Sequence, residues 1–235
     1  MSDTPHLKDS TDPGAPDDAA TDDELEAELA RLRAAAERPA FSVRVLGGVL
    51  AVGGLVGFWA ALRLLLDYLL TLEDPDAQLG CNLSVFIQCG AAMGSWQGSL
   101  LGFPNPVVGV AAFPVVVTIG VVVLAGFRPA PWFWRSLLAV STVAIGFIGF
   151  AMWTSLYALN ALCPWCMLVW AVMIPIYWLQ LVHALQERIL PAPDALRRLV
   201  VDHRWIGLAV IYAGVVVWIF AVMGSDLTTS IVDLF

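Results

Sequence analysis

The chain has few charged residues. Only 14% of its 235 residues are Asp, Glu, Lys or Arg, while 59% are apolar; soluble domains carry roughly 25% charged residues. Charge is absent from Ala77 to Phe127, from Ser136 to Gln186 and from Trp205 to Ser225. Each run can hold at least one bilayer crossing, which takes about 20 apolar residues. The composition argues against a water-soluble globular protein and predicts an integral membrane protein.

The uncharged runs divide into five predicted transmembrane helices, at residues 43–66, 106–127, 135–157, 163–185 and 205–224. The run from Ser136 to Gln186 must hold two of them. As one helix it would be about 76 Å long, far beyond the roughly 30 Å hydrocarbon core. We place the turn at Ala158–Pro164 and expect Pro114 and Pro175 inside helices. The predicted fold class is all-α integral membrane.

Basic residues are missing from one side of this arrangement. The segments 67–105, 158–162 and 225–235 contain no Lys or Arg, and every base except Arg63 falls on the side of the N-terminus. Cytoplasmic segments of membrane proteins are enriched in these residues. We therefore predict a multi-pass protein of the plasma membrane or cell inner membrane, with a cytoplasmic N-terminus. Arg63 should reach the outer surface and pair with Asp67, one turn further on.

The acidity of the chain lies in its N-terminal tail. The formal net charge is -8, of which -7 belongs to residues 1–40. The start of the tail is too poor in apolar residues to order itself, and it does not have the pattern of a secretory signal. Thr21–Glu24 is a capping box followed by leucines at helical spacing, which predicts a short juxtamembrane helix that ends before Pro39.

All four cysteines fall on the predicted outer side, where disulfides persist: Cys81, Cys89, Cys163 and Cys166. The first two have seven residues between them and lie in the loop after the first helix, and Cys163-Pro164-Trp165-Cys166 opens the fourth. Pro164 suits the first helical position, so the helix dipole and the unpaired amides favour a Cys163 thiolate. A bridge that closes over two residues is typically redox-active.

Two other interpretations of the cysteines remain open. The two pairs could be static disulfides that stabilise outer loops. A zinc site is a weaker interpretation, because no His lies outside the cytoplasmic side and the seven-residue gap fits zinc-ligand spacing poorly. We predict no metal site.

Three separated motifs together resemble the bacterial vitamin K epoxide reductase family. They are the Cys-x7-Cys loop, the Ala-Leu-Cys-Pro-Trp-Cys-Met sequence at residues 161–167, and Gly-Phe-Pro-Asn-Pro at 102–106. The resemblance covers about residues 43–185. It implies a four-helix bundle around a quinone, one peripheral helix, and a shorter half-helix at Gly90–Phe103 in the first outer loop.

The resemblance also suggests a division of the chain. Residues 1–40 would be an acidic cytoplasmic tail, 41–185 the four-helix catalytic membrane domain, and 186–235 a cytoplasmic loop with the fifth helix. Some family members carry a fused thioredoxin-like domain after the fifth helix. This chain ends at Phe235, so we expect a separate partner.

The resemblance implies an electron relay that generates disulfides. Cys81 would accept two electrons from a thioredoxin-fold dithiol oxidase outside the cytoplasm, which requires a mobile and solvent-exposed first pair. Cys89 would pass the electrons to Cys163 through a transient disulfide. Cys166 would then reduce a quinone of the menaquinone, ubiquinone or vitamin K type.

The quinone contacts are predicted from the family and from aromatic placement. Asn105 matches the family's quinone-contacting Asn at the start of the second helix. Trp170 stands where animal members carry a Tyr, so that hydroxyl donor is missing. Trp170, Tyr157 and Phe103 are candidate ring contacts, because aromatic residues gather at the outer helix ends. They could equally form an interfacial aromatic belt.

The predicted function is that of a membrane oxidoreductase that acts on thiols with a quinone as acceptor. Its partners would be the thioredoxin-fold protein and membrane lipid, without nucleic acid. Reduction of vitamin K epoxide itself is one alternative. The other is a non-enzymatic membrane protein with structural disulfides, although the internal repeats and intramembrane charges expected of a transporter are missing from the second to fifth predicted helices.

Overall fold

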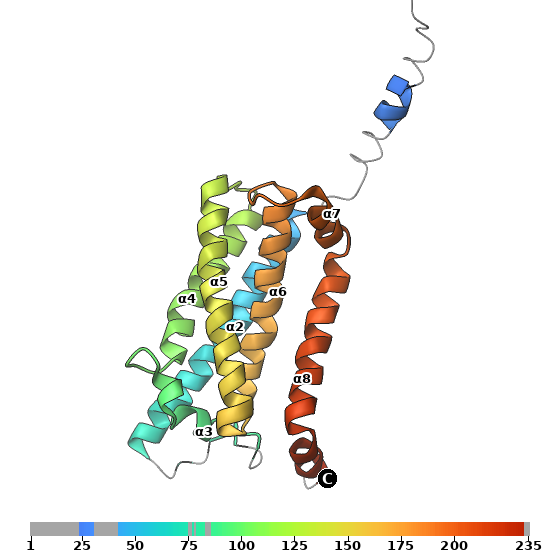
Figure 1. Ribbon diagram of the computed structural model, residues 1–235. Helices are drawn as coiled ribbons and strands as arrows, with labels where there is room; N and C mark the ends of the chain where they lie inside the picture. The colour runs from blue at the N-terminus through green and yellow to red at the C-terminus, as the bar shows by residue number, and fades with distance from the viewer. Residues whose placement is uncertain (1–23, 31–41, 75–76, 78, 83–85, 233–235) are drawn as a thin grey trace, which may run out of the picture. The chain divides into compact units, whose positions relative to one another are not determined.

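The computed structural model describes residues 24–30, 42–74, 77, 79–82 and 86–232 (Figure 1). The chain divides into two compact units, Met1–Ala40 and Phe41–Phe235. In the first unit a helix covers residues 24–30 and is exposed along its length. The capping-box residues before Glu24 and the predicted stop at Pro39 lie outside the described residues.

The second unit contains the five predicted long helices. They are α2 (Val43–Glu73), α4 (Pro106–Leu124), α5 (Pro131–Thr154), α6 (Pro164–Gln186) and α8 (Arg204–Val232). A π-helical turn, η2 (Ser155–Leu159), extends α5, and the turn to α6 follows as predicted, with Asn160 in the left-handed conformation. Five described helices are long and apolar enough to cross a membrane. The prediction of an all-α fold with five spans is confirmed.

Helix α2 extends beyond its predicted end. It continues from residue 66 to Glu73, where the amide of Asp74 still donates to the Leu70 carbonyl at 2.9 Å. Its buried residues recur every three or four positions, from Leu46 and Leu50 to Leu64 and Asp67. The predicted end at residue 66 rested on bilayer thickness, so it left out the last two turns of α2. The row of buried residues along α2 continues into these turns as far as Asp67.

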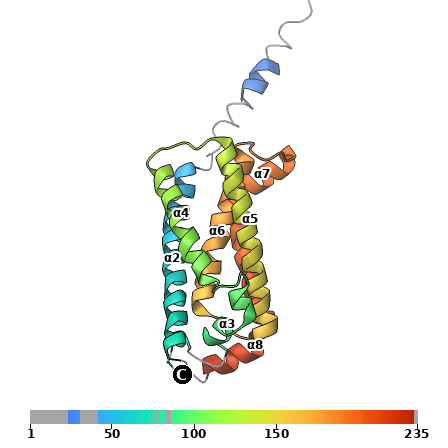
Figure 2. The ribbon, with the colours of Figure 1, turned by 90° about the vertical axis from the view of Figure 1, so that its left-hand side faces the viewer.

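Four of the long helices form a bundle. Helix α2 packs against α4 and α6, and α6 packs against α5, while α8 stands to one side with fewer contacts to α6 and η2 (Figures 1 and 2). Two polar contacts attach α8 to α6: the Tyr212 hydroxyl donates to the Ala171 carbonyl, and Trp178 Nε1 donates to the Arg204 carbonyl at 2.7 Å. The fifth helix is peripheral, as expected. A short amphipathic helix, α7 (Asp194–Asp202), links α6 to α8.

The segment expected to be one half-helix is instead two short helical turns. These are α3 (Gly90–Met93) and the 3-10 turn η1 (Trp96–Ser99). Ser95 separates them, because its hydroxyl donates to the Ala92 carbonyl at 2.8 Å and accepts from the Gly98 amide at 3.1 Å. A Cβ on Gly98 would lie 2.2 Å from the Ala92 oxygen, so the reversal requires glycine there. Helix α3 lies at one end of the bundle and α7 at the other (Figure 1).

Small residues allow α2 and α4 to approach closely. A Cβ on Gly120 of α4 would lie 2.4 Å from the Ala51 nitrogen and 2.7 Å from the Gly47 oxygen, both on the backbone of α2. Backbone atoms of a packed helix cannot move aside as a side chain can. This is how membrane helices gain van der Waals contact when lipid is as apolar as their own side chains.

We predict that Gly120→Ala destabilises the bundle. The added methyl forces α2 and α4 apart, and overpacking of this kind costs about 1–3 kcal/mol. Thermal unfolding in detergent should show a lower midpoint. Gly146→Ala on α5 is the matched control, because no atom lies within 4 Å of the position that its added Cβ would take and glycine weakens a helix relative to alanine. Equal midpoints for the two variants would contradict the assigned packing.

Candidate active site

A short backbone pairing holds the two cysteine segments together. The Leu162 amide donates to the Phe86 carbonyl at 2.7 Å, and the Gln88 amide donates to the Leu162 carbonyl at 3.1 Å. Ile87 and Leu162 thereby form an isolated parallel bridge. The residues that follow on the two segments are Cys89 and Cys163, and their Sγ atoms lie 3.3 Å apart.

The loop cysteines are joined to each other. Cys81 and Cys89 form a disulfide, with their Cα atoms 5.8 Å apart. Asn82 Oδ1 accepts from the amides of Cys89 at 3.0 Å and Gly90 at 3.4 Å, which fixes the start of α3. Cys81 is 3% exposed and Cys89 is fully buried. The expectation that this pair is exposed to solvent is wrong for this arrangement, because both sulfurs pack with Leu64, Leu79 and Cys163.

The Cys-x-x-Cys motif begins α6 as predicted. Cys163 is the N-cap, Pro164 is the first helical residue, and the Cys166 amide donates to Cys163 Sγ at 3.4 Å. Both cysteines of this motif are free thiols. A hydrogen bond from the Cys166 thiol, helped by the backbone amides of Cys166 and Trp165, lowers the pKa of Cys163, although burial opposes the shift. The N-terminal thiol is the activated one.

These contacts place the loop disulfide next to the free thiol of Cys163. A thiolate attacks a disulfide sulfur and displaces the other sulfur of the bond. Cys163 Sγ, with its lowered pKa, already touches Cys89 Sγ of the loop disulfide. Thiol–disulfide exchange between the two pairs therefore needs no large rearrangement.

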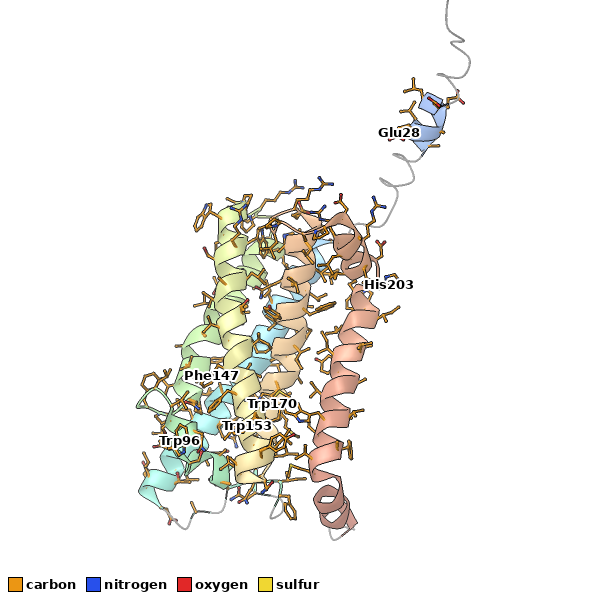
Figure 3. The ribbon with its side chains drawn as sticks, in the orientation of Figure 1. Glu28, Trp96, Phe147, Trp153, Trp170 and His203 are labelled. Atoms are coloured by element: carbon orange, nitrogen blue, oxygen red, sulfur yellow. A yellow bond between two sulfur atoms is a disulfide. The ribbon has the colours of Figure 1, made fainter. Side chains whose placement is uncertain are left out.

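A pocket lies directly beside Cys166. Its wall comes from α2, α4, α5, η2, α6 and the segment around α3 and η1, and includes Leu64, Tyr68, Ala92, Met93, Asn105, Phe147, Thr154, Ser155, Cys166 and Trp170. Figure 3 shows Phe147 and Trp170 in the part of the bundle nearer to α3, far from His203 at the opposite end. Most of this wall is apolar, which suits a flat, lipid-soluble ligand.

Comparison with known proteins identifies the family. A family model described as the vitamin K epoxide reductase family matches residues 48–181. The chain belongs to the vitamin K epoxide reductase family. No significant match was found among curated proteins or among solved structures.

Membership of the vitamin K epoxide reductase family fits the fold and the site together. The matched range runs from α2 to α6 and includes all four cysteines and the pocket wall. The protein is a helical membrane protein of an oxidoreductase family. The four cysteines remain its predicted catalytic residues, and the structure brings them together.

The four predicted quinone contacts separate into two groups. Asn105 and Trp170 line the pocket, and Trp170 is buried. Phe103 and Tyr157 are 43% and 51% exposed and do not line it. The Tyr157 hydroxyl accepts from Trp218 Nε1 of α8 at 3.1 Å, so this ring faces the peripheral helix. For Phe103 and Tyr157 the placement favours the aromatic-belt interpretation.

Asn105 has a structural task that the sequence did not reveal. Its side-chain Nδ2 donates to the Gln97 carbonyl at 2.7 Å, and its Oδ1 accepts from the Leu100 amide at 3.2 Å. The Asn105 side chain thus holds η1 in position at the pocket wall. One N–H of Nδ2 is left for the predicted contact with a ligand.

Thr154 is a pocket residue that the sequence analysis missed. Its side chain is 3% exposed, and within the described part of the chain its hydroxyl has no hydrogen-bond partner. A buried polar atom without a partner is costly, and this one lines the pocket beside Trp170 and Cys166. Two adjacent hydroxyl residues, Thr154 and Ser155, at the end of an apolar span were the available signal.

The predicted ion pair between Arg63 and Asp67 is wrong. The Arg63 guanidinium lies over the Trp165 ring, 6.0 Å from its centroid. Asp67 faces into the bundle, with Oδ2 3.6 Å from Cys81 Sγ. Helical spacing alone could not show that the loop disulfide would occupy the space beside this carboxylate.

Proposed function

We propose that the protein reoxidises a dithiol protein on the outer face of the membrane and passes the electrons through its two cysteine pairs to a quinone. The observation that carries this proposal is the 3.3 Å contact between Cys89 Sγ and Cys163 Sγ. Disulfides that only stabilise loops do not need their sulfur atoms in contact with another cysteine pair. Electron transfer between two pairs does require such a contact.

The proposed relay balances as two-electron exchange. A partner thiolate attacks Cys81 and displaces Cys89, which attacks Cys163 of an oxidised Cys163–Cys166 pair and displaces Cys166. The partner's second thiol then releases Cys81, whose sulfur attacks Cys89 and displaces Cys163. The outcome is an oxidised partner, a Cys81–Cys89 disulfide and two thiols at Cys163 and Cys166. The bonded and free cysteines of this structure correspond to that outcome.

The proposed partner is a thioredoxin-fold protein with a reduced Cys-x-x-Cys pair. Such a protein presents one nucleophilic thiol at its surface and holds the second in reserve. Because Cys81 is buried here, a partner thiol reaches its sulfur only when the covering residues, Leu79 among them, move away. The partner's contact with this end of the bundle would supply that displacement.

The proposed electron acceptor is a quinone of the menaquinone, ubiquinone or vitamin K type, bound in the pocket beside Cys166. Trp170 and Phe147 offer ring faces, while the Thr154 hydroxyl offers a hydrogen bond that no described protein group uses. A bound quinone accepts two electrons and two protons from a dithiol. Cys166, in the wall of the same pocket, is the thiol placed to deliver them.

The proposed orientation rests on the basic residues. Arg128, Arg188 and Arg198 belong to the turns and the short helix at the α7 end of the bundle, whereas Arg63 is the one base near the α3 end among the described residues. The positive-inside rule then favours the α7 end as cytoplasmic and the cysteines as extracytoplasmic.

The relay is tested by removing the thiols at its two ends. We expect Cys166→Ala to abolish reduction of a short-chain quinone, because no Cys163–Cys166 disulfide can form. In Cys81→Ala the quinone should instead cause the Cys89–Cys163 bond to accumulate, because Cys81 is the thiol that resolves it. Alkylation followed by non-reducing peptide mapping detects this bond, and Cys163→Ala is the control that cannot form it. Absence of a Cys89–Cys163 bond in quinone-treated Cys81→Ala would contradict transfer between the pairs.

The proposed contact of Thr154 with the quinone predicts different effects on protein stability and on quinone binding. Thr154→Val removes a hydroxyl that lacks a partner, so the thermal midpoint of the ligand-free protein should stay unchanged or rise. The dissociation constant for a short-chain quinone should increase about threefold to tenfold, the equivalent of one lost hydrogen bond. Quenching of tryptophan fluorescence measures the binding.

Two variants control the Thr154 experiment. Thr154→Ser keeps the hydroxyl and should bind the quinone nearly as the parent does. Thr142→Val lies on the same helix, where the Thr142 hydroxyl donates to the Leu138 carbonyl at 2.8 Å, and should leave quinone binding unaltered. If Thr154→Val bound the quinone normally, the hydroxyl would not be a ligand contact.

Orientation is tested with single cysteines at the two ends of the bundle. In a chain whose native cysteines are replaced by serine, Leu101→Cys and Ala130→Cys introduce exposed thiols near η1 and before α5. A membrane-impermeant maleimide applied to intact cells should label the first and not the second. The reverse pattern would place the relay in the cytoplasm and end the proposal of an extracytoplasmic partner.

A further inference from the structure

Asp67 is a buried carboxylate in contact with the relay. It lies on the buried stripe of α2 and is 9% exposed. Carboxylates seldom occupy such positions in membrane helices unless they take part in function, because burial of a negative charge without compensation is costly. Arg63, the nearest base along the helix, is directed over Trp165 instead.

The carboxylate is placed at the far end of a row of sulfur atoms. Asp67 Oδ2 lies 3.6 Å from Cys81 Sγ, which is bonded to Cys89 Sγ, which in turn lies 3.3 Å from Cys163 Sγ. In thiol–disulfide exchange the outer sulfurs of such a row alternate as attacking and leaving groups. Cys163 has amide and thiol donors to stabilise its negative charge. Cys81 instead has the Asp67 carboxylate beside its sulfur.

The two ends of the row therefore differ chemically. A neighbouring carboxylate disfavours a thiolate at Cys81 by charge repulsion but can accept its proton. Cys81 must lose a proton each time it closes the loop disulfide and must gain one each time the partner releases it. A group that touches the sulfur and exchanges a proton meets both needs.

Resting on the function proposed above, we propose that Asp67 is the general base for closure of the Cys81–Cys89 disulfide and the general acid when the partner's second thiol releases Cys81. In closure, the Cys81 thiol gives its proton to the Asp67 carboxylate while its sulfur bonds to Cys89 of the Cys89–Cys163 disulfide. The electron pair of the broken bond leaves on Cys163 as a thiolate. No net oxidation occurs in this step, and the proton remains on Asp67 until the partner's second thiol next releases Cys81 and leaves its sulfur to be protonated.

Few other ionisable groups lie near enough to compete with Asp67. Within one helical turn of Asp67 on α2 the titratable groups are Arg63 and Tyr68, and the start of α6 adds Cys163 and Cys166; the others on these two helices, Arg44, Glu73, Tyr177 and His183, lie further along them. The α3 turn contributes none. Arg63 is held at the Trp165 ring, and Cys163, whose thiolate the Asp67 charge also disfavours, contacts Cys89.

The test follows closure of the loop disulfide in one turnover. Fully reduced full-length protein in detergent is mixed with short-chain ubiquinone and menaquinone analogues in parallel, quenched with acid at increasing times, alkylated and mapped for disulfides. In Asp67→Asn we expect the Cys163–Cys166 bond to form at the parent's rate. The Cys89–Cys163 intermediate should then accumulate, because closure by Cys81 is slowed at least about tenfold at neutral pH, as for loss of a general base.

The pH profile separates a chemical role from a structural one. The parent's closure rate should level off at neutral pH and fall in acid, as expected of a step that uses a carboxylate base. The Asp67→Asn rate should keep rising toward the ordinary thiol range near about pH 8.5, so that its deficit narrows there. Asp67→Glu should retain the parent's plateau, and Glu73→Gln, an exposed acid on the same helix, should match the parent throughout.

The outcomes distinguish this inference from the function on which it rests. If the parent forms no disulfide with either quinone, the proposed function fails. If the parent turns over and Asp67→Asn closes the loop at the same rate with the same pH profile, only the role of Asp67 is overturned. The parent's profile alone decides the matter if Asp67→Asn does not fold, because a closure rate that climbs without a plateau through pH 8.5 excludes a carboxylate base.

Discussion

The site depends on two backbone hydrogen bonds between segments far apart in the chain. Residues 86–88 and Leu162 pair as a single parallel bridge, and this fixes Cys89 beside Cys163 before any sulfur chemistry takes place. Asn82 holds the other side of Cys89 through the amides that start α3. The geometry of the proposed relay therefore rests on main-chain contacts that involve no sulfur atom.

The bundle supplies what these contacts cannot. Cys163 caps α6, so its thiol has the amides and dipole of a long helix behind it, while α2 brings Asp67 to the opposite end of the sulfur row. The pocket lies beside the first two turns of α6. Its wall includes Cys166 and Trp170 of α6, together with Asn105 and the end of α5. Polar groups with distinct tasks are spaced along one end of an otherwise apolar assembly.

The fold was largely predictable because its signals are local. Long uncharged runs fixed the number of spans, and Pro164 with two flanking cysteines identified the start of α6. What failed depended on contacts across the chain. Helical spacing pairs Arg63 with Asp67, but Trp165 and Cys81 compete for them. Likewise, proximity in sequence grouped Tyr157 with the pocket, whereas its direction on the π-helical turn carries it to Trp218. The sequence could not single out Thr154, because its importance rests on the hydrogen-bond partner that its buried hydroxyl lacks among the described residues.

The burial of the loop disulfide has a consequence for how oxidising power is conserved. An exposed disulfide linked to a quinone would be discharged by any small thiol that diffused to it, and the membrane's electron acceptor would be consumed without making a single protein disulfide. Here Cys81 and Cys89 are shielded by Leu64 and Leu79. If the disulfide reacts as proposed, its partners must be large enough to bind this end of the bundle and uncover the Cys81 sulfur. Selectivity among competing thiols would then depend on their access to the buried Cys81 sulfur and not on their redox potentials.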